Sequence, residues 1–232
     1  MINRKFVCIL SVIFTVSTFS AWSTNAYANE VMISNGIRIL NHELSIGLDY
    51  DFFIENSTYN SNAYSSFMHG LSLDMGYSVF PDSTALFGFS CNFGCGMPFG
   101  IISTLDYQKI YIDHSTSNML GFTLKNSVGC AFRYMFDKWN RIDAFLGAVI
   151  DYYYLAYDTG LETVTRNDLQ NVVFGLQARF GYTYSFNNFI AIYAGAIFDY
   201  GFYSVAQIKY SDLYTSYALF EICPVCKAVM KF

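Results

Sequence analysis

Charged residues are scarce in this 232-residue sequence, in which Asp, Glu, Lys and Arg together make up only 13%. An average soluble domain carries about 25% of these residues. Hydrophobic residues reach 53% of the chain and aromatic residues 19%. A chain of this composition has too little charge to cover a molecule that faces water on every side. We therefore expect part of its surface to meet an apolar environment.

Long hydrophobic runs are missing as well. Beyond the N-terminal region, no run of 18 or more residues is both apolar and uncharged. A helix needs about 20 predominantly apolar residues to cross a bilayer, whereas a tilted β-strand needs only about 9–11. The sequence thus argues against membrane-spanning helices and leaves strands as the candidates.

Basic residues are few, and two of them open the chain. Arg4 and Lys5 precede an apolar stretch from Phe6 to Val16, and Ala26-Tyr27-Ala28 supplies the small-x-small pattern of a cleavage site. This arrangement is typical of a secretory signal peptide, which we predict over residues 1–28. A membrane anchor is the alternative, but the apolar stretch is short for that purpose.

Cleavage at this site leaves an acidic chain. It would remove two of the 13 basic residues and none of the 18 acidic ones, so 11 basic residues would face 18 acidic residues, a net charge of −7. A nucleic-acid-binding surface needs clustered Lys and Arg side chains. We therefore expect no nucleic-acid partner.

The cysteines do not form a disulfide framework. Five of the six follow the predicted signal, and an odd number cannot pair completely. Cys223 and Cys226 form a C-x-x-C pair, which could indicate redox or metal chemistry. A zinc site needs two further ligands and a redox pair usually opens a helix, and neither context is present. We predict no metal and no cofactor, with a strained local disulfide between Cys223 and Cys226 as the alternative.

What the sequence does contain is strict alternation. In residues 43–54, ELSIGLDYDFFI, apolar side chains at even positions alternate with small or polar residues from Glu43 to Asp51. A period of two is the signature of a β-strand with one apolar and one polar face. The pattern recurs along the chain and predicts eight strands in all, over residues 43–54, 70–79, 85–97, 120–136, 142–154, 172–186, 190–202 and 220–232. Pro224 cannot donate to a ladder and is expected to interrupt the upper half of the last strand.

The connections between these strands alternate in length. Short links are expected at 80–84, 137–141 and 187–188, and long ones at 55–69, 98–119, 155–171 and 203–219. Tight turns at one edge and long loops at the other are typical of outer-membrane barrels. A closed barrel also has no sheet edge that needs a partner, so a monomer is expected.

A soluble β-sandwich would alternate in the same way. Three features favour the barrel. The polar face is rich in Gly, Ser and Asp, which suit a narrow interior. The apolar face becomes aromatic near both strand ends, as expected at lipid headgroup level. Most strands also have the length that a tilted membrane strand requires. We predict an all-β, eight-stranded antiparallel up-and-down transmembrane β-barrel over residues 43–232, preceded by a short periplasmic lead-in over 29–42.

The sequence resembles the small eight-stranded outer-membrane β-barrels of bacteria, such as the OmpA transmembrane domain and OmpX. The sharpest local element is the end, KAVMKF, with apolar residues at alternating positions and a final Phe232. The resemblance implies residence in the bacterial outer membrane in contact with its lipid. It also implies that the barrel-assembly machinery recognises Phe232. No peptidoglycan-binding domain of the kind that longer relatives carry is visible in the sequence.

Eight strands enclose an interior just wide enough for side chains to fill, so a freely open porin is not expected. On the polar face, position along the strands places four charged residues near the middle of the lumen: Asp74, Lys125, Arg179 and Lys227. Charges in so dry a space must pair. We predict that this ion-pair network plugs the barrel. The alternative is a gate that passes small ions or solutes below an acidic outer mouth.

Two further kinds of function were weighed. His114 beside Ser115 and Ser117 resembles, loosely, the pattern of lipid A deacylases, but a loop His next to Ser is usually a solvated turn, and we predict no enzymatic activity. The segments 55–66 and 211–217 are rich in Tyr, Ser, Asn and Thr, the chemistry of recognition loops. The same composition also suits loops that merely stay soluble beside a lipid surface. The sequence thus favours a structural or surface-interaction, adhesin-like role, with an extracellular ligand bound through long loops. It assigns no binding residues.

Overall fold

The computed structural model describes residues 41–59, 62–81, 84–105, 108–113, 119–157, 167–208 and 216–232. The predicted signal peptide, most of the lead-in, and the residues His114, Ser115 and Ser117 lie outside this part of the chain. Within it, no helix is long and apolar enough to cross a membrane.

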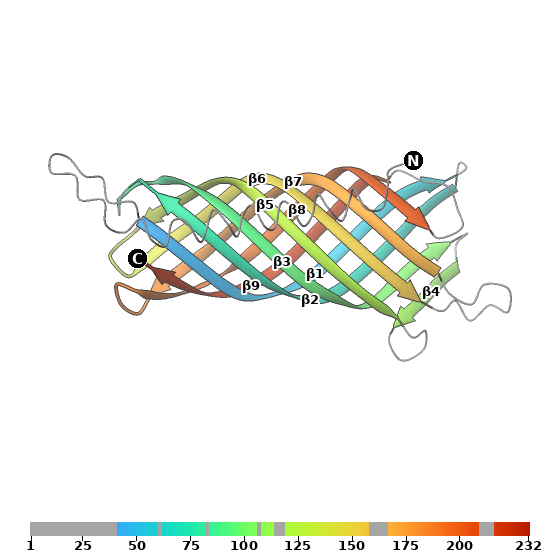
Figure 1. Ribbon diagram of the computed structural model, residues 1–232, viewed down its shortest axis with the longest axis horizontal. Coiled ribbons are helices and arrows are strands. Elements are labelled where there is room, and N and C mark those ends of the chain that lie inside the picture. Colours follow the sequence, from blue (N-terminus) through green and yellow to red (C-terminus); the bar gives the residue numbers. More distant parts are fainter. Residues whose placement is uncertain are drawn as a thin grey trace. The chain divides into compact units, whose positions relative to one another are not determined.

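The described residues form nine β-strands: β1 (Asn41–Tyr59), β2 (Asn62–Phe80), β3 (Phe87–Leu105), β4 (Gln108–Asp113), β5 (Leu120–Met135), β6 (Asn140–Tyr157), β7 (Asn167–Ser185), β8 (Ile190–Ile208) and β9 (Ser216–Lys231). Eight of them, all except β4, pair antiparallel in chain order, and β9 returns to pair with β1. The sheet therefore closes into an up-and-down barrel (Figure 1). The predicted fold class is confirmed. The short strand β4 pairs only with the outer part of β3 and extends that hairpin.

The two described ends of the chain meet where the barrel closes. The His42 backbone N–H donates to the Phe232 carbonyl at 2.8 Å, and the Phe232 N–H donates back to the His42 carbonyl at 2.9 Å. The tight turns after β5 and β7 lie at the same end of the barrel as Phe232 (Figure 1). We call this the short-turn end, and the opposite one the long-connection end.

The strands are longer at the long-connection end than the alternation predicts. The β1–β2 ladder continues from Ile54↔Phe67 to Tyr59↔Asn62, so most of the expected loop 55–69 is strand. Likewise, β3 continues through the expected loop 98–119 as far as Leu105. For β1 and β2 the prediction was wrong because the segment 55–66 has no apolar face, and backbone pairing without such a face leaves no alternation in the sequence.

Proline does not end the last strand either. β9 runs without interruption through Pro224, which faces outward and lies opposite Ala196 in the β8–β9 ladder. The N–H that Pro224 lacks affects instead the pairing of β9 with β1. The β1–β9 register runs from Glu43↔Lys231 to Asp49↔Val225 and resumes only at Phe52↔Ile222. The expected interruption is therefore a local gap in one ladder and does not break the strand.

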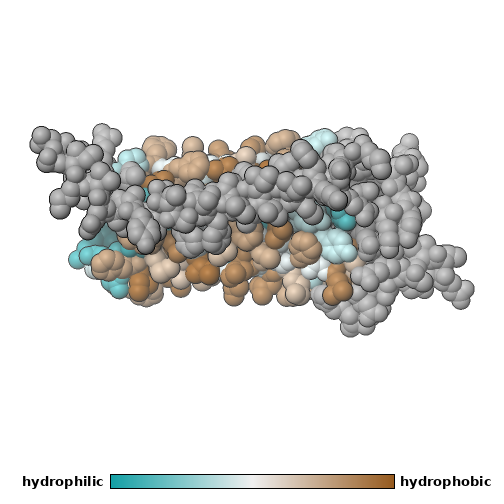
Figure 2. Space-filling model, viewed as in Figure 1, coloured by the Kyte–Doolittle hydropathy of each residue, from teal (hydrophilic) through white to brown (hydrophobic). Residues whose placement is uncertain are grey.

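Alternation sorts the side chains as expected. The outward positions are apolar and exposed, for example Leu48 (54%), Leu146 (63%) and Phe180 (58%), while the inward positions hold most of the buried polar residues. Figure 2 shows hydrophobic residues over the visible middle of the barrel, with hydrophilic ones toward its ends. Outward aromatic rings pair near the ends, as in Tyr134–Phe136 at 5.3 Å between ring centroids. An exterior of this kind matches lipid.

Candidate functional site: the barrel interior

Charged side chains inside the barrel fall into three groups along its axis. The first group, at the short-turn end, surrounds Glu43 of β1. Arg141 donates from its two terminal nitrogens to both Glu43 carboxylate oxygens at 2.5 and 2.6 Å, and Arg133 donates at 3.0 Å. Asp143 pairs with the Arg141 Nε at 3.0 Å. We call these four residues the short-turn network. Each carboxylate in it has a basic partner.

The second group occupies the middle of the barrel and contains three of the four predicted residues. Asp74 of β2 is ion-paired with Lys227 of β9 and, at 3.2 Å, with Arg179 of β7. The same guanidinium donates to the Asn92 side-chain oxygen at 2.7 Å. Asp74 and Lys227 are each only 2% exposed. We call Asp74, Arg179 and Lys227 the central network.

Lys125, the fourth predicted residue, lies elsewhere. Its ammonium is 2.9 Å from Asp199 Oδ2 and 2.7 Å from Glu221 Oε1, toward the long-connection end. The carboxylates of Asp51 and Asp151 lie in the same region, each close to Glu221. We call Lys125, Asp51, Asp151, Asp199 and Glu221 the acidic cluster. Position along the sequence alone does not predict this arrangement, because strand tilt brings β5 side chains to the height of the outer parts of β8 and β9.

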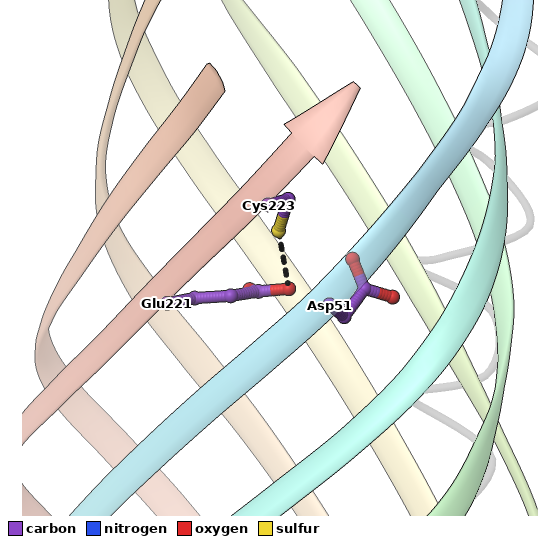
Figure 3. A group of neighbouring side chains, drawn as sticks. All are labelled: Asp51, Glu221 and Cys223. Carbon is purple, nitrogen blue, oxygen red and sulfur yellow. Dashed lines mark hydrogen bonds between the residues drawn. The ribbon is translucent and has the colours of Figure 1, made fainter. Parts of the chain in front are cut away.

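A cysteine borders the acidic cluster. Figure 3 shows Cys223 and Glu221 on β9, with Asp51 on the neighbouring β1, all projecting into the interior. The Cys223 thiol donates to Glu221 Oε1 at 3.2 Å. Cys226 is exposed on the opposite face of β9, and both thiols are free. Residues three apart on a strand point to opposite faces, so the alternative of a Cys223–Cys226 disulfide was wrong.

Beyond the acidic cluster, the interior becomes apolar. Seven buried residues pack together there: Phe53, Met68, Met119, Tyr153, Leu155, Val173 and Leu219. The Phe53 and Tyr153 rings lie 4.6 Å apart between centroids. We call this set the apolar cap. Sequence reasoning missed it, although Phe53 and Tyr153 have the same parity as Asp51 and Asp151 and could have been assigned to the inner face on that basis.

Small cavities lie between these groups in the part of the barrel that the structure describes. A cavity of about 70 Å³ lies at the short-turn end, bordered by Glu43, Arg141 and Asp143. A second cavity of about 10 Å³ lies beside Asp51, Tyr153 and Glu221. About 10–15 Å³ is enough for a single water molecule, so the first cavity has room for a few waters and the second for about one.

The described histidines do not form a catalytic arrangement. His42 Nδ1 lies 2.5 Å from the Tyr77 hydroxyl, and His69 Nδ1 lies 2.9 Å from the Tyr50 hydroxyl. His69 also stacks with the rings of Tyr50 and Phe67 on the outer aromatic surface. The His114 pattern on which a hydrolase would depend falls outside the described residues.

Fold and interior together define a small β-barrel of the outer-membrane type. No protein-family model and no curated protein matches the sequence. Among solved structures, the outer membrane protein OprG from Pseudomonas aeruginosa is similar over 85% of this chain and 98% of its own, with 9% identity and a TM-score of 0.55. A major outer membrane protein from Thermus thermophilus is similar over 84% of this chain and 100% of its own, with 10% identity and a TM-score of 0.51. The expected resemblance to small outer-membrane barrels is thus confirmed at the level of the fold.

Proposed function

We propose that the protein resides in the bacterial outer membrane and has a structural or surface-interaction role, with its barrel as a closed scaffold and no catalytic activity. The observation that carries this proposal is the filled interior. Two ion-pair networks, the acidic cluster and the apolar cap follow one another along the barrel, and the cavity of about 70 Å³ at the short-turn end has room for only a few waters. A barrel filled in this way suits a scaffold better than an open pore.

The long hairpins support an interaction outside the membrane. β1 and β2 have 19 residues each, about twice the 9–11 residues that a tilted strand needs to span a bilayer. The surplus pairs from Glu55↔Ser66 to Tyr59↔Asn62, in a segment whose sequence is polar and contains Tyr, Ser and Asn. Such a hairpin projects recognition-type residues beyond the lipid. We therefore place the binding of an extracellular ligand at this end.

The end of the last strand bears on assembly of the barrel in the membrane. Phe232 is 54% exposed at the end of the last strand, and its backbone is fixed to His42. We propose that the barrel-assembly machinery recognises this residue. The closed sheet favours a monomer in the membrane, because among the described strands only the short β4, which pairs with β3 alone, leaves an edge.

The scaffold role can be tested by conductance and by hairpin replacement. Purified protein in planar bilayers should show no steady ion current. Vesicles bearing the protein should bind to arrayed extracellular proteins and glycans, and replacing residues 56–65 with an Asn-Gly turn should abolish that binding while leaving the heat-dependent gel shift of the barrel intact. A steady current, or binding that the shortened hairpin leaves unchanged, would contradict the proposal.

A narrow gated channel is the second candidate. The observation that favours it is the excess of carboxylates in the acidic cluster, which would select cations at the outer end. Cation-selective openings that appear under voltage would favour this function over the closed scaffold.

A further inference from the structure

The acidic cluster contains more carboxylates than its lysine can balance. Four carboxylates, from Asp51, Asp151, Asp199 and Glu221, lie around the single ammonium of Lys125, which forms ion pairs with Asp199 and Glu221 and also donates to the Cys223 sulfur at 3.8 Å. In the other two networks each carboxylate contacts an arginine or a lysine, although the buried Asp49 beside Asp74 also has one oxygen without a hydrogen-bond partner. A buried carboxylate without a counter-ion is costly, so the excess charge needs further cations or protons.

Asp151 shows where the missing partner belongs. It is 2% exposed, and neither of its carboxylate oxygens has a hydrogen-bond partner. Lys125 lies directly opposite in the β5–β6 register, yet its ammonium turns away to Asp199 and Glu221. Buried polar atoms are nearly always paired. An unpaired carboxylate that faces two others is the arrangement expected when a bound ion completes the site.

The spacing of the oxygens suits one ion. A carboxylate oxygen from each of Asp151, Asp199 and Glu221 lies within 4.8 Å of the other two. Oxygen ligands bind Ca²⁺ at about 2.3–2.6 Å, so two oxygens on one ion are separated by at most about 5 Å. Of the three ligand residues only Glu221 lines the cavity of about 10 Å³, which has room for one water on that side of the site.

We propose that Asp151, Asp199 and Glu221 bind a divalent cation of the calcium type inside the barrel, between the central network and the apolar cap. The carboxylate oxygens of these three residues are hard ligands of the kind that Ca²⁺ prefers. Zinc would favour the thiolate of Cys223. In the structure Cys223 is a thiol that donates a hydrogen bond to Glu221 Oε1 (Figure 3).

Asp151 is on β6, whereas Asp199 and Glu221 are register partners on the paired strands β8 and β9, beyond the intervening β7. Such an ion would connect β6 with two strands to which it does not pair. The ion therefore ties β6 to β8 and β9 past β7, directly below the apolar cap. We expect it to stabilise the long-connection end more than the short-turn end.

Calcium binding can be measured on the full barrel protein in a non-ionic detergent, free of lipopolysaccharide, which itself binds divalent cations. After treatment with chelator, Ca²⁺ should bind with a stoichiometry of one and raise the unfolding temperature. Tb³⁺ is a luminescent substitute for Ca²⁺, and excitation of tyrosine should sensitise it, because Tyr153 borders the cluster. Added Ca²⁺ should quench that luminescence.

Two variants locate the site. Asp151→Asn should abolish both the Ca²⁺-dependent shift and the Tb³⁺ signal, and should stabilise the cation-free protein by removing an unpaired charge. Asp143→Asn is the matched control, because Asp143 is another interior aspartate but belongs to the short-turn network. It should lower stability and leave the response to Ca²⁺ unchanged.

Three results would overturn the proposal. The first is unfolding that depends on pH but not on Ca²⁺, which would mean that protons neutralise the cluster. The second is Ca²⁺ binding that survives in Asp151→Asn, which would place the ion elsewhere. The third is preferential binding of Zn²⁺ that Cys223→Ser removes, which would assign the cluster to a softer metal.

Discussion

Lys227 of β9 reaches Asp74 of β2 across the whole width of the intervening strand β1. Gly47 makes this contact possible, because it is the β1 residue opposite both Asp74 and Lys227 in the two ladders. A Cβ atom at Gly47 would lie closest to the Cys226 carbonyl oxygen, with which it would clash, and 2.5 Å from Lys227 Cγ. The lysine stem therefore passes over a position that has no side chain.

Replacing Gly47 by alanine should displace Lys227 and weaken its ion pair with Asp74. We expect a loss of about 2–3 kcal/mol in the free energy of unfolding, typical of a forced fit combined with a disturbed buried pair. Urea unfolding of the protein in lipid vesicles would measure it. Gly94→Ala is the matched control, because the nearest atom to an added Cβ there is the Lys125 Cβ at 3.3 Å. Equal effects of the two substitutions would contradict this view of Gly47.

Neutralising Lys227 should destabilise the barrel strongly. Lys227→Met leaves the buried Asp74 with Arg179 alone, and removal of one partner from a buried pair typically costs about 3–5 kcal/mol. Lys231→Met, at the end of the same strand, should cost much less, because that side chain is only half-buried and donates to the Ser185 hydroxyl. Combining Lys227→Met with Asp74→Asn should cost less than the two changes added together, since they share one interaction. Unchanged urea unfolding of Lys227→Met would show that Arg179 alone satisfies Asp74.

Opening the apolar cap should make the barrel leaky. Phe53→Ala removes the ring that packs 4.6 Å from Tyr153 and should lower stability by about 3–5 kcal/mol, as large aromatic truncations in packed interiors do. Ion current across a planar bilayer should rise at the same time. The control is Phe52→Ala, which changes the neighbouring, outward-facing ring. If Phe53→Ala folds and conducts no more than this control, the cap does not limit passage.

One tight turn should respond to acid. Asp137 Oδ1 accepts the backbone N–H groups of Trp139 at 2.6 Å and Asn140 at 2.9 Å, and its Oδ2 accepts the Asn140 side-chain amide at 2.8 Å. These hydrogen bonds, first that of the Asn140 side chain and then that of the Trp139 backbone, hold the pKa of Asp137 below its ordinary value of 3.8. The stabilisation is therefore fully present above the ordinary pKa and is lost as the pH falls through the lowered one.

The β7–β8 turn offers a reciprocal test. Asn187 Oδ1 accepts the N–H groups of Phe189 and Ile190, both at 2.8 Å, in the same local geometry. Asp137→Asn should remove the acid sensitivity of the first turn, and Asn187→Asp should create it in the second. Unfolding of each variant between neutral pH and about pH 3, compared with the unchanged protein, would show the difference. Identical pH profiles for all three proteins would rule out a role for the carboxylate charge.

Alternation predicts the barrel well because each strand separates two very different environments. A shift of one residue would turn Leu176 and Phe180 inward and Gln177 and Arg179 into lipid, so the register is strongly specified. The assignment of inner and outer faces therefore needs no three-dimensional information. Where both faces of a strand meet water, as expected for residues 55–66, no apolar alternation is needed. The sequence therefore predicts that β1 ends before its actual last residue.

The partners inside the lumen are harder to predict. Lys125 and Asp74 are both central in their own strands, but tilt displaces facing strands along the axis, so Lys125 meets Asp199 and Glu221 from the other side of the barrel. Glu43 and Arg141, nearly a hundred residues apart, meet for the same reason. Alternation indicates that such residues face inward, and only the closed geometry determines which of them pair.

The gap in the β1–β9 ladder gives the wall a seam. These strands are the first and last of the barrel, so their pairing completes the cylinder, and beside Pro224 the ladder skips Tyr50 and Asp51 between Asp49↔Val225 and Phe52↔Ile222. Lateral opening of the cylinder toward the bilayer would begin where fewest hydrogen bonds must break. Asp51 is itself one of the two skipped residues, and its side chain belongs to the acidic cluster. The wall therefore has fewer hydrogen bonds between strands beside the most acidic part of its interior.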